Sequence, residues 1–230
     1  FGFSHISETS AAAAAVAAAH AGHAAGRECG YPVIASSCPV VVNLVEKYYP
    51  GAVANLAPVA SPMITHMRWL KDKFGEDCFT VFAGPCIAKK QEAERAEYKG
   101  LADAVLTFQE LLSVFGKRGI SYDECIPVNP DNASAKSESA RRFPVEGGLL
   151  LSAGCSGPDG SRDIAITGIE EIREALEHLD DYSDVRIIEM LACKGGCIMG
   201  SAIGKGRGSH ARRKLIEAYA AEMGDLGGAG

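Results

Sequence analysis

Residues 185–197 read Val-Arg-Ile-Ile-Glu-Met-Leu-Ala-Cys-Lys-Gly-Gly-Cys, an apolar run that leads directly into a loop with two cysteines. The apolar residues up to Leu191 predict a strand that is buried inside a sheet. Two glycines between Cys193 and Cys197 permit a tight turn, which brings both thiols beyond the carboxyl end of the strand. The stretch therefore predicts a buried strand that ends at a pair of possible metal ligands.

The same order of strand, loop and helix occurs twice more with a cysteine in the loop. Residues 33–35 are apolar and lead into Ser36-Ser37-Cys38-Pro39, and the apolar residues 78–83 lead into Gly84-Pro85-Cys86. Apolar residues at helical spacing follow Pro39, and a charged helix is predicted at 87–98. All three loops thus come directly after a predicted strand.

Further strands and helices alternate along the chain. Apolar runs predict strands at 104–106 and 164–166, and the remaining patterns predict helices at 10–25, 61–74, 109–117, 169–179 and 209–223. The polar and irregular residues 127–148 suit a mobile connection between two lobes. The alternation predicts an α/β fold with two lobes of mostly parallel, twisted sheet flanked by helices, and an active site in the cleft between them.

Composition and charge exclude several classes of protein. The chain has 230 residues, 47% hydrophobic and 23% charged, which is enough for a core and unlike a disordered or collagen-like chain. Its formal charge of −6 gives no overall electrostatic support for binding nucleic acid. The longest apolar run, residues 11–19, is nearly all alanine and too short to cross a membrane, and no basic secretory signal precedes it. A cytoplasmic location is therefore expected.

The cysteines of the three loops are candidate metal ligands. Strands of an open parallel sheet share one edge at their carboxyl ends, so these thiols can converge although they lie far apart in sequence. Four thiolates suit a four-iron cluster or zinc, although structural zinc usually has paired cysteines at short spacing. Four buried cysteines without a metal are the remaining alternative. The candidate ligands are Cys38, Cys86, Cys193 and Cys197.

The other reactive residue types give weaker signals. Among the remaining cysteines, Cys78 is expected in the core of a strand and Cys155 in a flexible loop, while Cys29 and Cys125 have no comparable setting. The histidines show no ligand spacing and are expected on helix surfaces, and no nucleotide-binding motif is present. A basic patch near the end of the chain suits a solvated surface or the docking of an acidic electron donor. It consists of Lys205, Arg207, Arg212, Arg213 and Lys214.

The three loops resemble the motifs of the catalytic domain of the iron-only, or [FeFe], hydrogenases. Residues 35–39 read Ala-Ser-Ser-Cys-Pro where the family has Thr-Ser-Cys-Cys-Pro, and residues 85–92 match Pro-Cys-x-x-Lys-x-x-Glu. Residues 189–197 match Glu-x-Met-x-Cys-x-Gly-Gly-Cys, with Leu191 in place of the methionine. A Ser-Pro dipeptide of the family is matched at 61–62. The resemblance covers most of the chain.

The resemblance implies an H-cluster, in which the four candidate cysteines hold a [4Fe-4S] cluster next to a diiron unit. The diiron unit carries carbon monoxide, cyanide and a bridging dithiolate. By motif position Cys197 bridges the two parts, Lys89 donates a hydrogen bond to a cyanide, and Pro39, Pro85 and Leu191 line the cofactor. The implied reaction is the reversible conversion of dihydrogen into protons and electrons. The implied partner is a ferredoxin-like electron donor or an upstream iron-sulfur domain, with no nucleic acid and no membrane.

The chain departs from the family at its proton relay. Ser37 stands in place of the relay cysteine, and a hydroxyl gives up a proton far less readily than a thiol near neutral pH. The family's relay serine falls on Ala57 and its two relay glutamates on Ala17 and His20. These losses resemble the sensory branch of the family.

Together the motifs and the losses imply one catalytic H-cluster domain over residues 1–230, without the family's N-terminal segment, that acts slowly in hydrogen sensing. The alternative is a non-catalytic [4Fe-4S] relative in redox sensing or iron-sulfur assembly. A third reading is a zinc-binding interaction domain.

Overall fold

The computed structural model describes residues 2–27, 32–121, 123, 125–126, 128–131, 138–155, 162–204 and 206–221. The strands are β1 (Val33–Ile34), β2 (Val81–Gly84), β3 (Ala104–Thr107), β4 (Ile164–Thr167) and β5 (Ile187–Leu191). The α-helices are α1 (Ser10–Ala25), α2 (Pro39–Tyr48), α3 (Pro62–Phe74), α4 (Ala88–Ala93), α5 (Phe108–Lys117), α6 (Glu138–Arg141), α7 (Gly148–Ser152), α8 (Ile169–Glu177) and α9 (Ser209–Ala221). Short 3-10 helices include η1 (Pro50–Asn55), η4 (Leu179–Tyr182) and η5 (Cys197–Met199). The α/β class predicted from the sequence is confirmed.

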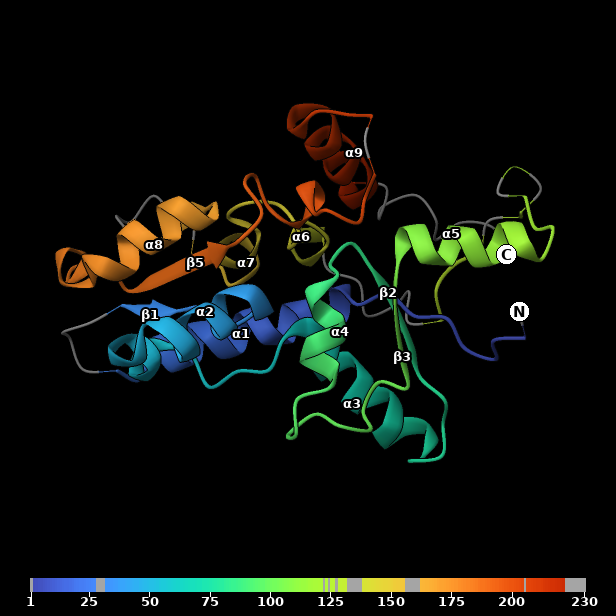
Figure 1. Ribbon diagram of the computed structural model, residues 1–230, viewed down its shortest axis with the longest axis horizontal. Coiled ribbons are helices and arrows are strands. Elements are labelled where there is room, and N and C mark those ends of the chain that lie inside the picture. The colour runs from blue at the N-terminus through green and yellow to red at the C-terminus, as the bar shows by residue number, and fades with distance from the viewer. Residues whose placement is uncertain are drawn as a thin grey trace.

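The first sheet has the strand order β1-β5-β4, and both of its strand pairs are parallel. Its central strand is β5, whose residues are all buried, as the apolar run in the sequence predicts. Alternate residues face opposite sides: Ile188 and Met190 pack with α2 and α8, and Ile187 packs with α1 and α7. Figure 1 shows α8 and α1 on opposite sides of this sheet.

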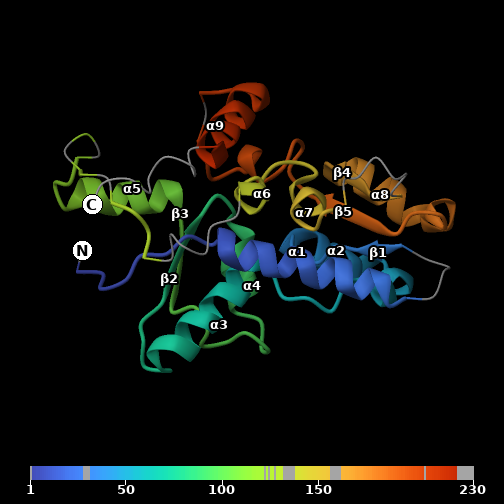
Figure 2. The same cartoon turned by 180° about the vertical axis from the view of Figure 1, so that it is seen from behind.

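The second sheet consists of β2 and β3, which are also parallel. Buried Met63, Ile64 and Met67 of α3 pack against it, with Phe82 and Val105 from the two strands. Figures 1 and 2 show the two sheets on opposite sides of α4. Each sheet therefore has its own hydrophobic core, and the chain between them positions the site.

Several helix starts are fixed by the residues that the sequence suggests. Pro39 is the first residue of α2, where its lack of an N–H group has no cost. Ser61 caps α3 and accepts a hydrogen bond from the Ile64 N–H. Thr107 and Glu110 form a capping box at the start of α5.

Two elements are shorter than predicted: a helix ends earlier and a strand begins later. The helix expected at 87–98 is limited to α4, because Arg95 turns aside to bind Glu46 on α2, with Nη2 2.7 Å from Oε1. The strand expected from 78 begins at 81. The Cys78 carbonyl instead accepts a hydrogen bond from Lys71 Nζ at 2.7 Å. Cys78 thus lies before the strand and is partly exposed rather than in the core.

The prediction of a mobile connection at 127–148 is wrong for the second half of that segment. Residues 138–141 form α6, and the buried Arg141 pairs with Glu8 at 2.8 Å between Nη2 and Oε2. Val145 is also buried and forms an antiparallel bridge with Gly196. Residues 127 and 132–137 lie outside the described residues. In the part of the chain that the structure describes, no helix is long and apolar enough to span a membrane.

Candidate metal centre

Three of the four candidate cysteines follow the carboxyl ends of strands. Cys38 is the N-cap of α2 and comes after β1, while Cys193 comes after β5, which pairs with β1 in the same sheet. Cys86 follows β2 of the second sheet, and Cys197 begins η5. The candidate ligands therefore come from loops that follow strands of both sheets.

Close contacts hold the three loops together. Lys89 in α4 donates from Nζ to the carbonyl oxygen of Ser37, at 3.2 Å, and so joins the Cys86 helix to the Cys38 loop. Gly200 allows the third loop to approach, because a Cβ there would lie 2.7 Å from the Pro85 carbonyl oxygen. The same Cβ would lie 3.0 Å from the Cys197 carbonyl oxygen. A side chain at 200 would therefore push the Cys197 loop away from the Cys86 loop.

The glycines between Cys193 and Cys197 have the backbone that only glycine adopts readily. Gly195 has φ of +84° and Gly196 has φ of +94°. A Cβ at Gly196 would lie 2.6 Å from the Pro144 carbonyl oxygen, so the loop packs tightly on the turn before α7. The Gly195 N–H donates to Thr167 Oγ1 at 3.1 Å, which ties the loop to the end of β4.

The thiols influence one another electrostatically. Burial, together with negative charge on Cys38, Cys86 and Cys193 and against the effect of Lys89, raises the pKa of the Cys197 thiol to about 12. Burial also raises the pKa of the Cys193 thiol, followed by charge on Cys38 and Cys86. The four sulfurs therefore share one region, and their ionised forms need positive charge to be stable there.

That donor set fits an iron-sulfur cluster. Thiolates are the usual ligands of such clusters, and a cluster of several iron atoms spans a wider gap than one ion. Among the residues that the structure describes, no three Cys, His, Asp or Glu side chains meet as they would around a single metal ion. Zinc would need its sulfurs about 2.3 Å from one point.

Lys89 is the cation beside the thiols. Its side chain is 12% exposed, and its Nζ lies 2.7 Å from Oε2 of Glu92, whose side chain is 6% exposed. This buried pair sits one helical turn beyond Cys86. Glu92 keeps the ammonium in place and offsets part of the cost of its burial.

The other predicted site residues have different roles in the structure. Pro39 is buried at the first position of α2, and Leu191 packs in the core of the first sheet beside Cys38. Pro85 contacts the third loop through its backbone, next to Gly200. Ser37 is buried, and its Oγ has no hydrogen-bond partner among the described residues. A buried hydroxyl with no hydrogen-bond partner thus lies next to the candidate ligand Cys38.

Two histidines lie inside the protein rather than on helix surfaces. His20 is fully buried, and its Nε2 accepts a hydrogen bond from the Ser36 N–H at 3.1 Å while Nδ1 lies 2.7 Å from the Val16 carbonyl oxygen. Burial lowers the pKa of His20. His66 is buried between Ser7 and Thr9, with Oγ and Oγ1 at 2.9 and 3.0 Å from its ring nitrogens. Neither lies among the candidate ligands.

The remaining cysteines and the basic patch are separate from the thiol cluster. Cys155 is buried in the core with Leu149 rather than in a flexible loop, Cys125 is exposed, and Cys29 lies outside the described residues. Arg212 is not a free surface cation. It donates to the Ile198 carbonyl at 2.8 Å and so supports the loop after Cys197. Arg207 and Lys214 are exposed, Arg213 is half-buried, and Lys205 lies outside the described residues.

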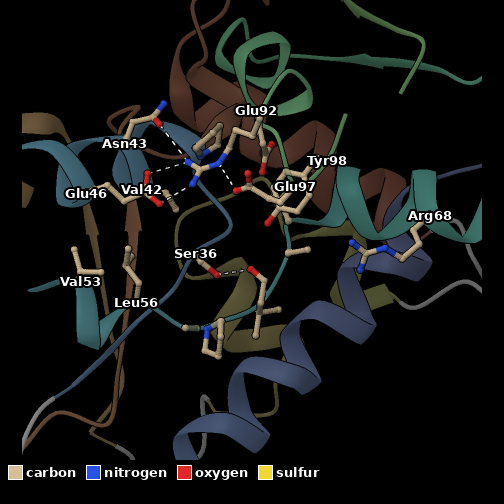
Figure 3. Close-up of a pocket in the computed structure, with 17 residues that line it drawn as sticks. Ser36, Val42, Asn43, Glu46, Val53, Leu56, Arg68, Glu92, Glu97 and Tyr98 are labelled. Carbon is tan, nitrogen blue, oxygen red and sulfur yellow. Dashed lines mark hydrogen bonds and ion pairs between the residues drawn. The ribbon is translucent and has the colours of Figure 1, made fainter. Parts of the chain in front are cut away.

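A cavity of about 490 Å³ adjoins the Cys38 loop. Ser36 and Pro39 of that loop line it, together with the buried Glu92. Figure 3 shows Glu92, Glu97 and Tyr98 close together on one side of the cavity and Ser36 on another. Reasoning from the sequence missed this cavity, because its walls come from α2, η1, α3, α4 and the residues between and after them, which are far apart in the sequence.

Comparisons with known proteins find relatives that are hydrogenases and iron-sulfur cluster assembly factors. The family model "Iron only hydrogenase large subunit, C-terminal domain" matches residues 1–201. The periplasmic [Fe] hydrogenase large subunit of Nitratidesulfovibrio vulgaris is 28% identical over 213 residues, which cover 74% of this chain and 51% of that protein. The cytosolic Fe-S cluster assembly factor NAR1 of Kluyveromyces lactis is 31% identical over 91 residues, 40% of this chain and 19% of that protein.

Solved structures share the fold. An [FeFe]-hydrogenase from Chlamydomonas reinhardtii superposes with a TM-score of 0.69 at 18% identity, and the match covers 98% of this chain and 75% of that one. The chain spans about half the length of the first curated relative and 37% of iron hydrogenase 1 of Clostridium pasteurianum.

Proposed function

Because the chain belongs to the family of the iron only hydrogenase large subunit, C-terminal domain, we propose that the four cysteines of its three loops bind a [4Fe-4S] cluster. The observation that carries this proposal is that the buried Cys38 and the half-buried Cys86, Cys193 and Cys197 lie close enough to influence one another electrostatically, beside Lys89. Four thiolates supply four negative charges, and iron supplies the positive charge that their burial demands.

We further propose that the cluster is part of an H-cluster and that the protein is an oxidoreductase that interconverts dihydrogen with protons and electrons. In this role the four cysteines would hold the cubane, and Cys197 would also hold a diiron unit that carries carbon monoxide, cyanide and a dithiolate. The bound group supplies the chemistry that makes and splits dihydrogen, and the cubane carries the electrons. The matches to hydrogenase large subunits support this proposal.

The chain's own residues would orient and charge-balance the group. Lys89 stands beside the thiols, where its ammonium can donate to a cyanide nitrogen, and Glu92 fixes its position at 2.7 Å. The free hydroxyl of Ser37 can donate to or accept from the bound group. Since a hydroxyl is a poor acid at neutral pH, proton delivery through Ser37 would be slow. Slow turnover suits a hydrogen sensor, because a sensor reports whether dihydrogen is bound and does not need to convert it quickly.

The second candidate is a non-catalytic relative that holds only the [4Fe-4S] cluster and acts in iron-sulfur assembly or redox sensing. Two observations favour it. Several cytosolic Fe-S cluster assembly factors match part of the chain at 29–36% identity. The relay positions of the hydrogenases are also occupied by Ala17, His20 and Ala57, of which none is a carboxylate or hydroxyl.

Infrared spectroscopy separates the two functions. The full chain is matured with the diiron cofactor, and its spectrum and iron content are recorded. Carbonyl and cyanide bands with about six iron atoms per chain support the hydrogenase. Absence of these bands with about four iron atoms per chain supports the non-catalytic relative.

The partner and the location follow from the same proposal. A ferredoxin-like electron donor or an upstream iron-sulfur domain would exchange electrons with the cubane. The exposed Arg207, just before α9, and the exposed Lys214, within α9, suit an acidic donor. A cytoplasmic location is part of the same proposal.

A further inference from the structure

The buried strand β5 carries a single polar side chain, that of Glu189. All residues of Ile187–Leu191 are buried, and Glu189 is only 1% exposed. A carboxylate is costly in such surroundings unless hydrogen-bond donors point at it. Glu189 therefore belongs to the residues whose partners explain why they are buried.

Its partner is the start of α7, 40 residues away in the chain. The Leu149 N–H donates to Oε1 of Glu189 at 3.2 Å. The residue before α7 is Gly147, which has no side chain to accept from the first N–H groups of the helix. Figures 1 and 2 both show α7 beside β5. Glu189 thus caps α7 from the neighbouring strand.

The turn before α7, residues 144–148, packs on the loop that carries Cys197. The Ile198 N–H donates to the Pro144 carbonyl oxygen at 3.2 Å, and Val145 forms an antiparallel bridge with Gly196. A Cβ at Gly196 would lie 2.6 Å from the Pro144 carbonyl oxygen, so the two segments are in close contact. The residues on both sides of Cys197 are therefore held by this turn.

The other end of the cysteine loop has a different support. Cys193 follows β5, and the Gly195 N–H donates to Thr167 Oγ1 at the end of β4. This bond does not involve the turn before α7. Loss of the Glu189 hydrogen bond is therefore expected to displace Cys197 more than Cys193.

We propose that Glu189 is a positioning residue for the metal centre: it holds the start of α7, which fixes the turn 144–148 and through that turn the position of Cys197. The inference rests on the proposed four-cysteine site. The reach of the side chain carries the effect rather than its charge, because the group that it binds is a neutral backbone N–H.

The test measures alkylation of each thiol by iodoacetamide in the full chain without metal, followed by mass spectrometry. Glu189→Leu removes the acceptor, and Glu189→Asp keeps the charge but shortens the side chain by a methylene group. Both are expected to speed alkylation of Cys197 roughly fivefold or more relative to Cys193, because local opening exposes one thiol and not the other.

Glu189→Gln is the variant that should preserve the position of Cys197. Its amide oxygen can accept from the Leu149 N–H, and its amide nitrogen takes the place of Oε2, which has no hydrogen-bond partner among the described residues. The ratio of the Cys197 and Cys193 rates is expected to stay that of the unchanged protein.

Ile64→Ala is the control for a general loss of stability. Ile64 is fully buried in the core of the second sheet, which contains none of the four cysteines. It is expected to leave the ratio of the Cys197 and Cys193 rates unchanged. An unchanged ratio in both Glu189→Leu and Glu189→Asp, or a ratio that changes in Glu189→Gln but not in Glu189→Asp, would overturn the inference.

Hydrogen exchange of the unchanged protein gives a readout that needs no variant. If the start of α7 holds the turn, opening at Leu149 also frees the Ile198 N–H, so the Leu149 amide should not open more often than the Ile198 amide. Opening at Leu149 that is about tenfold more frequent than opening at Ile198 would overturn the inference. Neither readout uses iron. A chain that takes up no iron on reconstitution therefore refutes the cluster, while the alkylation rates still decide the role of Glu189.

Discussion

The Nζ of Lys89 lies 3.2 Å from the carbonyl oxygen of Ser37, although the two residues follow strands of different sheets. The hydrogen bond spans the junction of the two sheets at the point where the cysteine loops meet. Its donor is also paired with the buried Glu92. The Lys89 ammonium therefore both holds the two sheets together and places a positive charge beside the cysteine thiols.

Lys89→Met should destabilise the protein by about 3–5 kcal/mol, because it leaves Glu92 buried without its cation. Urea unfolding of the protein without cofactor measures the loss. The double variant Lys89→Met with Glu92→Met should recover most of it. Lys90→Met is the control, since Lys90 and its partner Glu110 are far more exposed, and it should leave the midpoint nearly unchanged. Equal losses in Lys89→Met and Lys90→Met would contradict the role of the buried pair.

Ser37→Cys should raise hydrogen turnover by roughly tenfold if proton supply limits the rate, because a thiol is a much stronger acid than a hydroxyl. The buried hydroxyl has no partner to lose, so the substitution should not disturb the loop. Turnover per iron is measured after maturation, with the exposed Ser113→Cys as control. An unchanged rate in Ser37→Cys would mean that protons do not pass this position.

Glu189→Gln should make stability less dependent on pH. Burial raises the pKa of Glu189 from 4.5 to about 7, so the folded state disfavours its ionised form. Its stabilising effect is therefore present below pH 4.5 and lost as pH rises through 7. Between these limits the unchanged protein should lose roughly 2–3 kcal/mol relative to Glu189→Gln. Urea unfolding at pH 5 and pH 8 measures this difference, and parallel pH curves for the two proteins would refute it.

His66→Gln should reduce the loss of stability that the unchanged protein shows at acid pH. Burial, with a smaller effect of charge on His5, lowers the pKa of His66 from 6.5 to about 4. A buried neutral histidine contributes stability that is present above pH 6.5 and is lost as pH falls toward 4. The unchanged protein should lose roughly 2–3 kcal/mol more than His66→Gln over this range. His178→Gln, at an exposed position, serves as control. If His66→Gln lost as much stability as the unchanged protein when the pH falls, the role of His66 would be contradicted.

The local parts of the fold could be predicted from the sequence. The apolar run of β5, the proline at the start of α2 and the cap Ser61 each depend on a few neighbouring residues. The three cysteine loops were predicted for the same reason, since each follows its own strand.

Features that join distant parts of the chain could not be predicted. His20 resembles a surface residue of an alanine-rich helix until the Ser36 N–H, 16 residues away, is placed against it. Arg141 pairs with Glu8 across 133 residues, which orders a segment whose composition is typical of a loop. The cavity beside Glu92 has walls from four separate elements, and no spacing in the sequence indicates it.

Iron and sulfide content of single cysteine variants tests the central claim most directly. The protein is reconstituted without oxygen, and iron, sulfide and zinc are counted for Cys38→Ala, Cys86→Ala, Cys193→Ala and Cys197→Ala, with the exposed Cys125→Ala as control. We predict about four iron atoms per chain in the unchanged protein and in the control, and loss of most of the iron in each of the four variants, most completely in Cys197→Ala. Full iron in Cys38→Ala or Cys86→Ala, or zinc in place of iron in the unchanged protein, would contradict a single four-cysteine cluster.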